Sequence, residues 1–153
     1  MIFKKGVNFT ITSSNLERST ITLAGVDVAQ RLVPFLLEVD YTFAINALAI
    51  PPSNYVTLNM GIGKDDDFTL LPSDDDLLHM IQFQFAGDGG DPSSWTWSQE
   101  SSKHVMFNYP FAVAKETLDI NVGCSALLTA VIGVRLTYEI KKIKDSELVA
   151  LIA

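Results

Sequence analysis

The stretch EVDYTFAIN, from Glu38 to Asn46, carries the clearest structural signal in this chain. Apolar side chains occupy every second position in it, at Val39, Tyr41, Phe43 and Ile45. Successive side chains of a β-strand point to opposite faces of its sheet, so this period of two predicts a strand with one buried face.

The same period recurs along the rest of the chain. We expect further strands in VNFTIT (7–12), YVTLNM (55–60), MIQFQF (80–85), HVMFNY (104–109), TLDINV (117–122) and GVRLTYEIK (133–141), with shorter candidates in STITLA (19–24) and DFTLL (67–71). Clusters of proline, glycine and aspartate separate them, such as IPPSN (50–54) and AGDGGDPSS (86–94). A parallel sheet would need helical crossovers for which the chain has no room. The pattern therefore predicts an all-β, antiparallel sandwich of about eight strands, most readily a jelly roll.

The alternation also predicts the hydrophobic core. Its expected members are Phe9, Ile11, Val39, Tyr41, Phe43, Val56, Leu58, Ile81, Phe83, Phe85, Val105, Phe107, Ile120, Leu136 and Tyr138. The single cysteine, Cys124, lies in the apolar stretch NVGCSALLTAVIG. It excludes an internal disulfide, and we expect it to be a buried small hydrophobic residue.

Two segments have helical features. The residues from Asp27 to Val33 could form a short helix ended by Pro34, although a strand fits them nearly as well. The tail DSELVALIA begins with Asp145, a good N-cap. Its apolar residues Leu148, Leu151 and Ile152 fall on one face at helical spacing. A helix of about two turns is not stable alone, so it must dock either on its own sandwich or on a neighbouring subunit.

Length and composition favour one globular domain over residues 1–153, with 48% hydrophobic and 19% charged residues. The formal net charge of -7 disfavours general nucleic-acid binding, because an acidic chain repels phosphate. The N-terminus does not read as a signal peptide. The longest apolar run, Ala126 to Val134, is about half the length of a membrane helix, so we expect a soluble protein without a membrane span.

Residues that could carry chemistry are few. The clusters Asp65–Asp67 and Asp74–Asp76, and the turn GDGGD, could bind calcium, but none has the spaced ligands of a known calcium loop, and solvated turns explain them better. His79 and His104 lack both a glycine–serine–glycine nucleophile elbow and the spacing of a zinc site. No glycine-rich phosphate loop is present. We therefore expect no catalytic residue, metal or cofactor, unless one histidine meets an acid and a serine in the fold, as in a small hydrolase.

Trp95 and Trp97 share one face of the extended segment SSWTWSQ. Two adjacent indoles can stack on sugar rings or contact a partner, or they can cover the edge of the sandwich. A carbohydrate-binding sandwich module is therefore the alternative function.

Two longer stretches carry a family resemblance. VRLTYEIKKIKDSELVALIA (134–153) resembles the C-termini of small coat proteins of bacterial viruses, and YTFAINALAIPPSNYVTLNMGIG (41–63) is similar in style to single jelly-roll capsid proteins. The resemblance implies an eight-stranded jelly roll that is not an enzyme and assembles with its own copies, and with other virion proteins, in a virion. The chain lacks the basic N-terminal arm of many coats, which puts direct genome binding in doubt and would suit an outer decoration protein. On this interpretation Leu148, Leu151 and Ile152 form a subunit contact.

Overall fold

The computed structural model describes residues 2–48, 55–86 and 99–152. The strands are β1 (Ile2–Thr22), β2 (Leu32–Leu48), β3 (Tyr55–Gly63), β4 (Leu77–Ala86), β5 (Gln99–Ala112) and β6 (Thr117–Lys142); a 3₁₀ helix, η1 (Val28–Gln30), and the helix α1 (Asp145–Ile152) complete the elements. The strand pairs are antiparallel. The predicted all-β class with a short C-terminal helix is confirmed.

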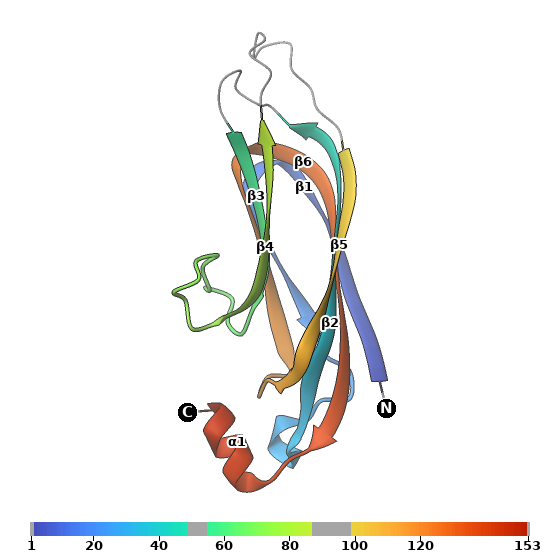
Figure 1. The fold of residues 1–153 in the computed structure, drawn as a ribbon, viewed down its shortest axis with the longest axis vertical. Coiled ribbons are helices and arrows are strands. Elements are labelled where there is room, and N and C mark those ends of the chain that lie inside the picture. Colours follow the sequence, from blue (N-terminus) through green and yellow to red (C-terminus); the bar gives the residue numbers. More distant parts are fainter. Residues whose placement is uncertain (1, 49–54, 87–98, 153) are drawn as a thin grey trace.

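The two long strands, β1 and β6, each run through both layers of the sandwich (Figure 1). The first part of β1, Ile2–Ile11, pairs with the second half of β6, which also pairs with β2. The later part of β1, Leu16–Thr22, pairs with the first half of β6, which also pairs with β3. Each half of these strands therefore belongs to a different sheet.

Counting these halves separately gives eight strands in two four-stranded sheets. The first sheet has the order β5–β2–β6–β1 and the second has the order β4–β3–β6–β1. The rings of Phe43 on β2 and Phe83 on β4 meet edge to face with centroids 4.6 Å apart, so the two sheets pack face to face. This is the arrangement of a jelly roll.

An irregularity in the β1–β6 ladder separates the halves. Ser14 is opposite Leu128 and Leu16 is opposite Gly123, so four residues of β6 have no partner in β1. Ser13 has a positive φ of 50° at the same point. Bulges of this kind bend a strand and increase its twist, which lets one strand serve two sheets.

One expectation about β6 is wrong. The sequence indicates separate strands at 117–122 and 133–141, but the structure has one continuous strand from Thr117 to Lys142. The buried positions keep one phase along the whole strand, from Leu118 through Leu128 to Leu136. Exposed apolar residues in the middle, Leu127 and Val131, hide this alternation in the sequence.

The predicted core is largely confirmed. Ile11, Val39, Tyr41, Phe43, Val56, Leu58, Ile120, Leu136 and Tyr138 are buried, and Phe9, Ile81, Phe83, Val105 and Phe107 are partly buried against them. Cys124 is buried, with 8% of its surface exposed. The side chain of Phe85 lies outside the described residues.

A second prediction, a strand in DFTLL (67–71), is also wrong. These residues are irregular and belong to a loop, residues 64–76, here called the strap, which leaves β3 and rejoins at β4. The strap lies against the outer face of the second sheet, where Phe68 is buried over Gly63. Arg18 donates to the carbonyl oxygen of Asp66 at 2.8 Å, and Asn121 donates to that of Phe68 at 2.7 Å. These contacts with β1 and β6 replace the ladder that a strand would need.

The segment after Asp27 combines both alternatives that its sequence allows. Only Val28–Gln30 is helical, and Arg31 ends this turn in the left-handed conformation with φ 62°. Strand β2 then begins at Leu32 and continues through Pro34, which lies opposite Ile140. Pro34 therefore does not end a helix, and its carbonyl oxygen accepts a hydrogen bond from the backbone of Val113 at 3.1 Å.

Helix α1 forms as predicted, with one difference at its start. The carbonyl oxygen of Lys144 accepts from the N–H groups of Glu147 and Leu148, and the Glu147 carboxylate accepts from the N–H of Lys144 at 2.7 Å. Lys144 is thus the N-cap, and the expectation that Asp145 caps the helix is wrong. Glu147 lies three residues after Lys144, the position from which a glutamate reaches back to the N–H of the N-cap residue.

Candidate functional site

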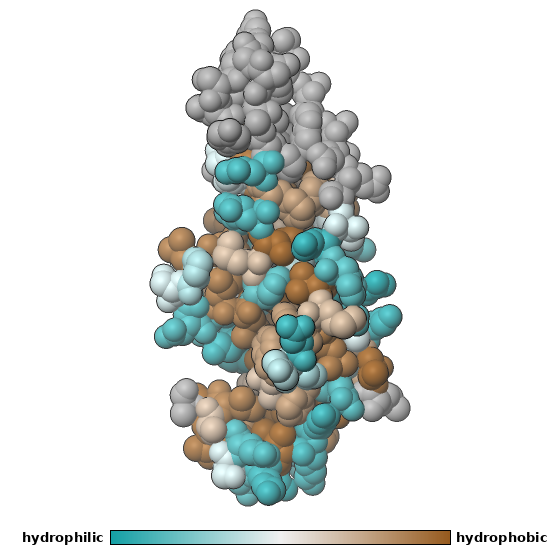
Figure 2. All heavy atoms as spheres, viewed as in Figure 1, coloured by the Kyte–Doolittle hydropathy of each residue, from teal (hydrophilic) through white to brown (hydrophobic). Residues whose placement is uncertain are grey.

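Helix α1 exposes an apolar face at one end of the molecule (Figures 1 and 2). Val149, Leu151 and Ile152 are 66%, 36% and 65% exposed, and no residue of this helix is buried. Leu148 is half-buried. The three residues predicted as a contact therefore lie on one short helix, with Leu151 and Ile152 exposed and Leu148 half-buried.

The start of α1 is attached firmly to the sandwich. Ile143 is 9% exposed, and its N–H donates to the carbonyl oxygen of Arg31 at 3.0 Å. The guanidinium group of Arg31 also pairs with Asp145 at 3.2 Å. The helix is therefore positioned by its N-terminal end, while its apolar face does not pack into the core.

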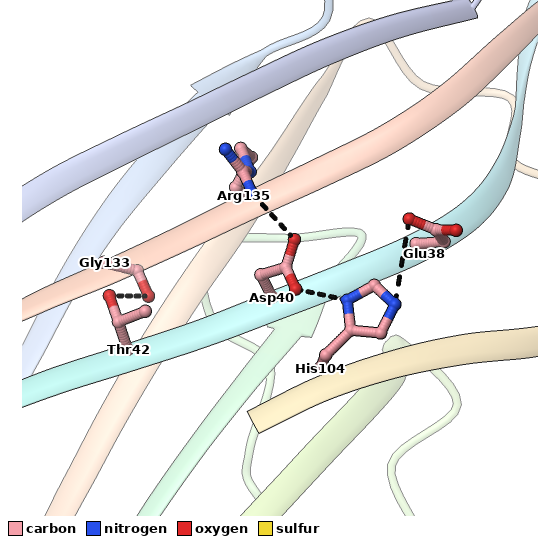
Figure 3. A network of polar contacts seen from close by, with 6 residues as sticks. All are labelled: Glu38, Asp40, Thr42, His104, Gly133 and Arg135. Carbon is pink, nitrogen blue, oxygen red and sulfur yellow. Dashed lines mark hydrogen bonds and ion pairs between the residues drawn. The ribbon is translucent and has the colours of Figure 1, made fainter. Parts of the chain in front are cut away.

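A polar network crosses the outer face of the first sheet (Figure 3). Asp40 on β2 accepts from Nδ1 of His104 on β5 and pairs with Arg135 on β6 at 3.3 Å. Nε2 of His104 lies 3.9 Å from a carboxylate oxygen of Glu38. Partial burial raises the pKa of Asp40, but the hydrogen bonds and positive charges of His104 and Arg135 outweigh it and hold that pKa below its usual value.

This network has the charges of a catalytic dyad but no nucleophile. Both ring nitrogens of His104 face carboxylates, and among the described residues no serine hydrogen-bonds to it. Thr42, the nearest hydroxyl in Figure 3, donates instead to the carbonyl oxygen of Gly133 at 3.4 Å. A general base must reach the proton that it removes. The arrangement of the described residues therefore cross-links three strands, β2, β5 and β6.

His79, the second histidine, lies between the two sheets. Its Nδ1 is 2.9 Å from the hydroxyl oxygen of Tyr41, and its ring meets that of Phe107 edge to face. Burial lowers the pKa of His79. This environment keeps the imidazole neutral and gives it a packing role.

The strap gathers carboxylates near its two ends. Asp65, Asp67 and Asp76 place oxygens within 4.8 Å of one another, a geometry that could hold a cation. However, Lys115 lies 3.4 Å from Asp65 and supplies a positive charge there. Asp74 accepts from the backbone and side chain of Thr69, which lowers the pKa of Asp74 and closes the turn. The acidic clusters therefore act as the ordered turns of the strap.

Sequence reasoning missed a groove beside the strap, on the outer face of the second sheet. Its volume is about 430 Å³, and it is lined by Leu16, Arg18, Thr57, Asn59, Phe68, Thr69, Leu70, Leu71, Asn121, Gly123, Cys124 and Ser125. The side chain of Leu70 lies over Gly61 and Gly123. Glycines inside strands often mark a close approach by other parts of a chain, so Gly61, Gly63 and Gly123 were the available signal.

Trp95 and Trp97 are outside the described residues. Among the described helices, none is long and apolar enough to cross a membrane.

No protein-family model matches this chain, and no curated protein matches it. Solved structures with a similar fold include dimeric latent PorU from Porphyromonas gingivalis, with a TM-score of 0.50 and 9% identity; the match covers 90% of this chain and only 13% of PorU. The cyanophage Pam1 capsid matches with a TM-score of 0.46, 13% identity and coverage of 90% and 83% of the two chains. The decameric BFDV capsid protein matches with a TM-score of 0.40, 9% identity and coverage of 92% and 98%. The expected weak resemblance to capsid proteins is present, and at these identities it concerns the fold alone.

Proposed function

We propose that this chain is a non-enzymatic structural subunit that self-assembles, and specifically a coat or decoration subunit of a virion. The observation that carries the proposal is α1, a helix of eight residues with no buried residue and an open apolar face. Leu148, Leu151 and Ile152 form the subunit contact in this proposal.

The energetics of α1 support a contact with another molecule. Isolated helices shorter than about 12 residues are marginal in water, so packing of the apolar face is the usual source of their stability. Full burial of a leucine or isoleucine side chain contributes about 1.5–3 kcal/mol. Contacts of this size are modest singly, but a closed symmetric assembly repeats the contact in every subunit.

The remaining features agree with a structural role. The His104 network lacks a nucleophile among the described residues, so it supports no hydrolase. The net charge of -7 disfavours contact with a genome, and we place the partners among further copies and other virion proteins. The alternative, a carbohydrate-binding module, depends on Trp95 and Trp97 and has no support from the described residues.

The test is the mass of the full chain in solution by light scattering, with negative-stain electron microscopy of the same sample. We expect rings or shells from the full chain and monomers from a chain that ends at Asp145. A matched control is Tyr109→Ser, because Tyr109 is 86% exposed and belongs to another element, β5. Assembly of the shortened chain to the same extent as the full chain would show that α1 is not the contact, and a full chain that stays monomeric would refute the proposal.

A further inference from the structure

The groove beside the strap has the chemistry to receive an amphipathic helix. Leu16 and Leu71 line it and are 51% and 58% exposed, and the half-buried Leu70 adds apolar surface. An apolar groove on a rigid sheet is a recurrent binding site for a helix that presents apolar residues at i, i+3 and i+4. Helix α1 has this spacing in Leu148, Leu151 and Ile152.

The charges of groove and helix are complementary. Among the described residues that line the groove, Arg18 is the one with a charge, and it is exposed. The first turn of α1 carries Asp145 and Glu147, and its last turn carries no basic residue. Glu147 therefore offers a charge opposite to that of Arg18, while Asp145 stays paired with Arg31, and this favours α1 over a basic helix.

The helix of the same subunit is held away from this groove. Leu151 and Ile152 line a polar hollow together with both ends of the strap and with the residues just before β6 begins at Thr117. The other residues of this hollow are Lys64, Asp65, Asp76, Ala114 and Lys115. The groove contains Gly123 and its neighbours, which lie about 20 Å further along the strand.

Two contacts fix the start of the helix in that position. Ile143 is buried and bonded to the backbone of Arg31, whose side chain also pairs with Asp145. While these contacts hold, α1 cannot reach the groove of its own subunit. A helix α1 that binds in the groove therefore belongs to a second copy of the chain.

We infer that the groove between β1, β3, β6 and the strap receives α1 of a neighbouring subunit, so that the assembly contact runs head to tail. This inference rests on the proposed self-assembly and adds the acceptor surface to it. A contact between two different surfaces of one chain generates rings when the rotation closes.

The test uses two variants that each lose one side of the contact. Leu71→Asp removes the acceptor and keeps α1, whereas Leu151→Asp with Ile152→Asp removes the donor and keeps the groove. Each of these side chains is at least about a third exposed, so the fold should persist, which circular dichroism and the melting temperature check. Leu71→Ser serves as the milder second acceptor variant, and Tyr109→Asp is the control on an exposed residue elsewhere.

We expect each variant alone to be monomeric at the concentration at which the full chain assembles. An equimolar mixture of the two should form dimers, because one intact helix and one intact groove remain between them. Light scattering of the separate and mixed samples measures this directly.

The outcomes separate the inference from the proposed function. If the Leu71 variants assemble like the full chain while the α1 variant does not, the contact is α1 against some other surface and the inference is wrong. Monomers in the mixture would also overturn it. If the full chain never assembles, the proposed function fails, and the inference fails with it.

Discussion

The hydroxyl oxygen of Tyr41 lies 2.9 Å from Nδ1 of His79, and this contact joins the two facing sheets through β2 and β4. Tyr41 is fully buried, and burial raises its pKa, so the phenol keeps its proton. With His79 neutral and protonated on Nε2, the phenol donates to Nδ1. The pair is a polar link between the two sheets.

Substituting Tyr41→Phe should destabilise the fold by about 1–3 kcal/mol, because it leaves the half-buried Nδ1 of His79 without its donor. Urea unfolding at a pH near 8 measures the change. Tyr109→Phe is the control. Tyr109 is exposed, so loss of its hydroxyl group should change the free energy of unfolding by less than about 0.5 kcal/mol. Equal midpoints for the Tyr41 variant and the original chain would contradict a stabilising bond.

The stability of the fold should fall as the pH drops below about 6.5, the ordinary pKa of histidine. Burial depresses the pKa of His79 in the folded state, so between the folded and unfolded values the unfolded chain binds more protons and gains population. The stabilisation is complete above the unfolded pKa and is lost as the pH falls through the folded one. The His79→Gln variant should show a flatter profile in urea unfolding between about pH 5 and 8, and an unchanged slope would assign the effect to another group.

Substituting Gly63→Ala should displace the strap from the outer face of the second sheet. A Cβ there would overlap the ring of Phe68, which is buried, so Gly63→Ala should cost about 1–3 kcal/mol by overpacking. Gly123→Ala is the matched control, because its Cβ would meet Leu70 at 3.5 Å, an ordinary contact. Hydrogen exchange of the strap should quicken in the first variant alone, and equal exchange in both would show that Phe68 does not anchor the loop.

The thiol of Cys124 should react slowly with an aromatic disulfide reagent at neutral pH. Burial raises its pKa, and the thiolate is the reactive form. Addition of denaturant should make the reaction rapid and stoichiometric, as followed by absorbance. Rapid labelling of the folded protein would mean that the sheet opens near Cys124 far more often than its burial implies.

Much of the fold was predictable because its signals are local. The alternation at Val39, Tyr41 and Phe43 indicates a strand wherever the chain goes, since one face must be buried. The spacing of Leu148 and Leu151 indicates α1 for the same reason. The bulge of β6 and the irregular strap were not predictable in this way, because contacts with distant residues determine both.

The candidate site was only half predictable. The apolar residues of α1 are visible in its sequence, but the groove joins Leu16 on β1, Leu71 on the strap and Gly123 on β6. No pattern within a window of a few residues brings these three together. Likewise, Asp40, His104 and Arg135 form one network although hydrogen-bonded partners lie 64 and 95 residues apart.

The sequence by itself determined the all-β class, most of the strands, helix α1 and the apolar faces of these elements, because side-chain direction in a strand or helix follows from a local repeat. The tertiary structure decided which strands are neighbours, where β1 and β6 pass from one sheet to the other, and which surfaces stay open. The physical reason is that every backbone offers the same hydrogen-bonding groups, so a strand can pair with many others. Only the packing of the whole chain selects the register that buries each apolar face and leaves α1 and the groove exposed.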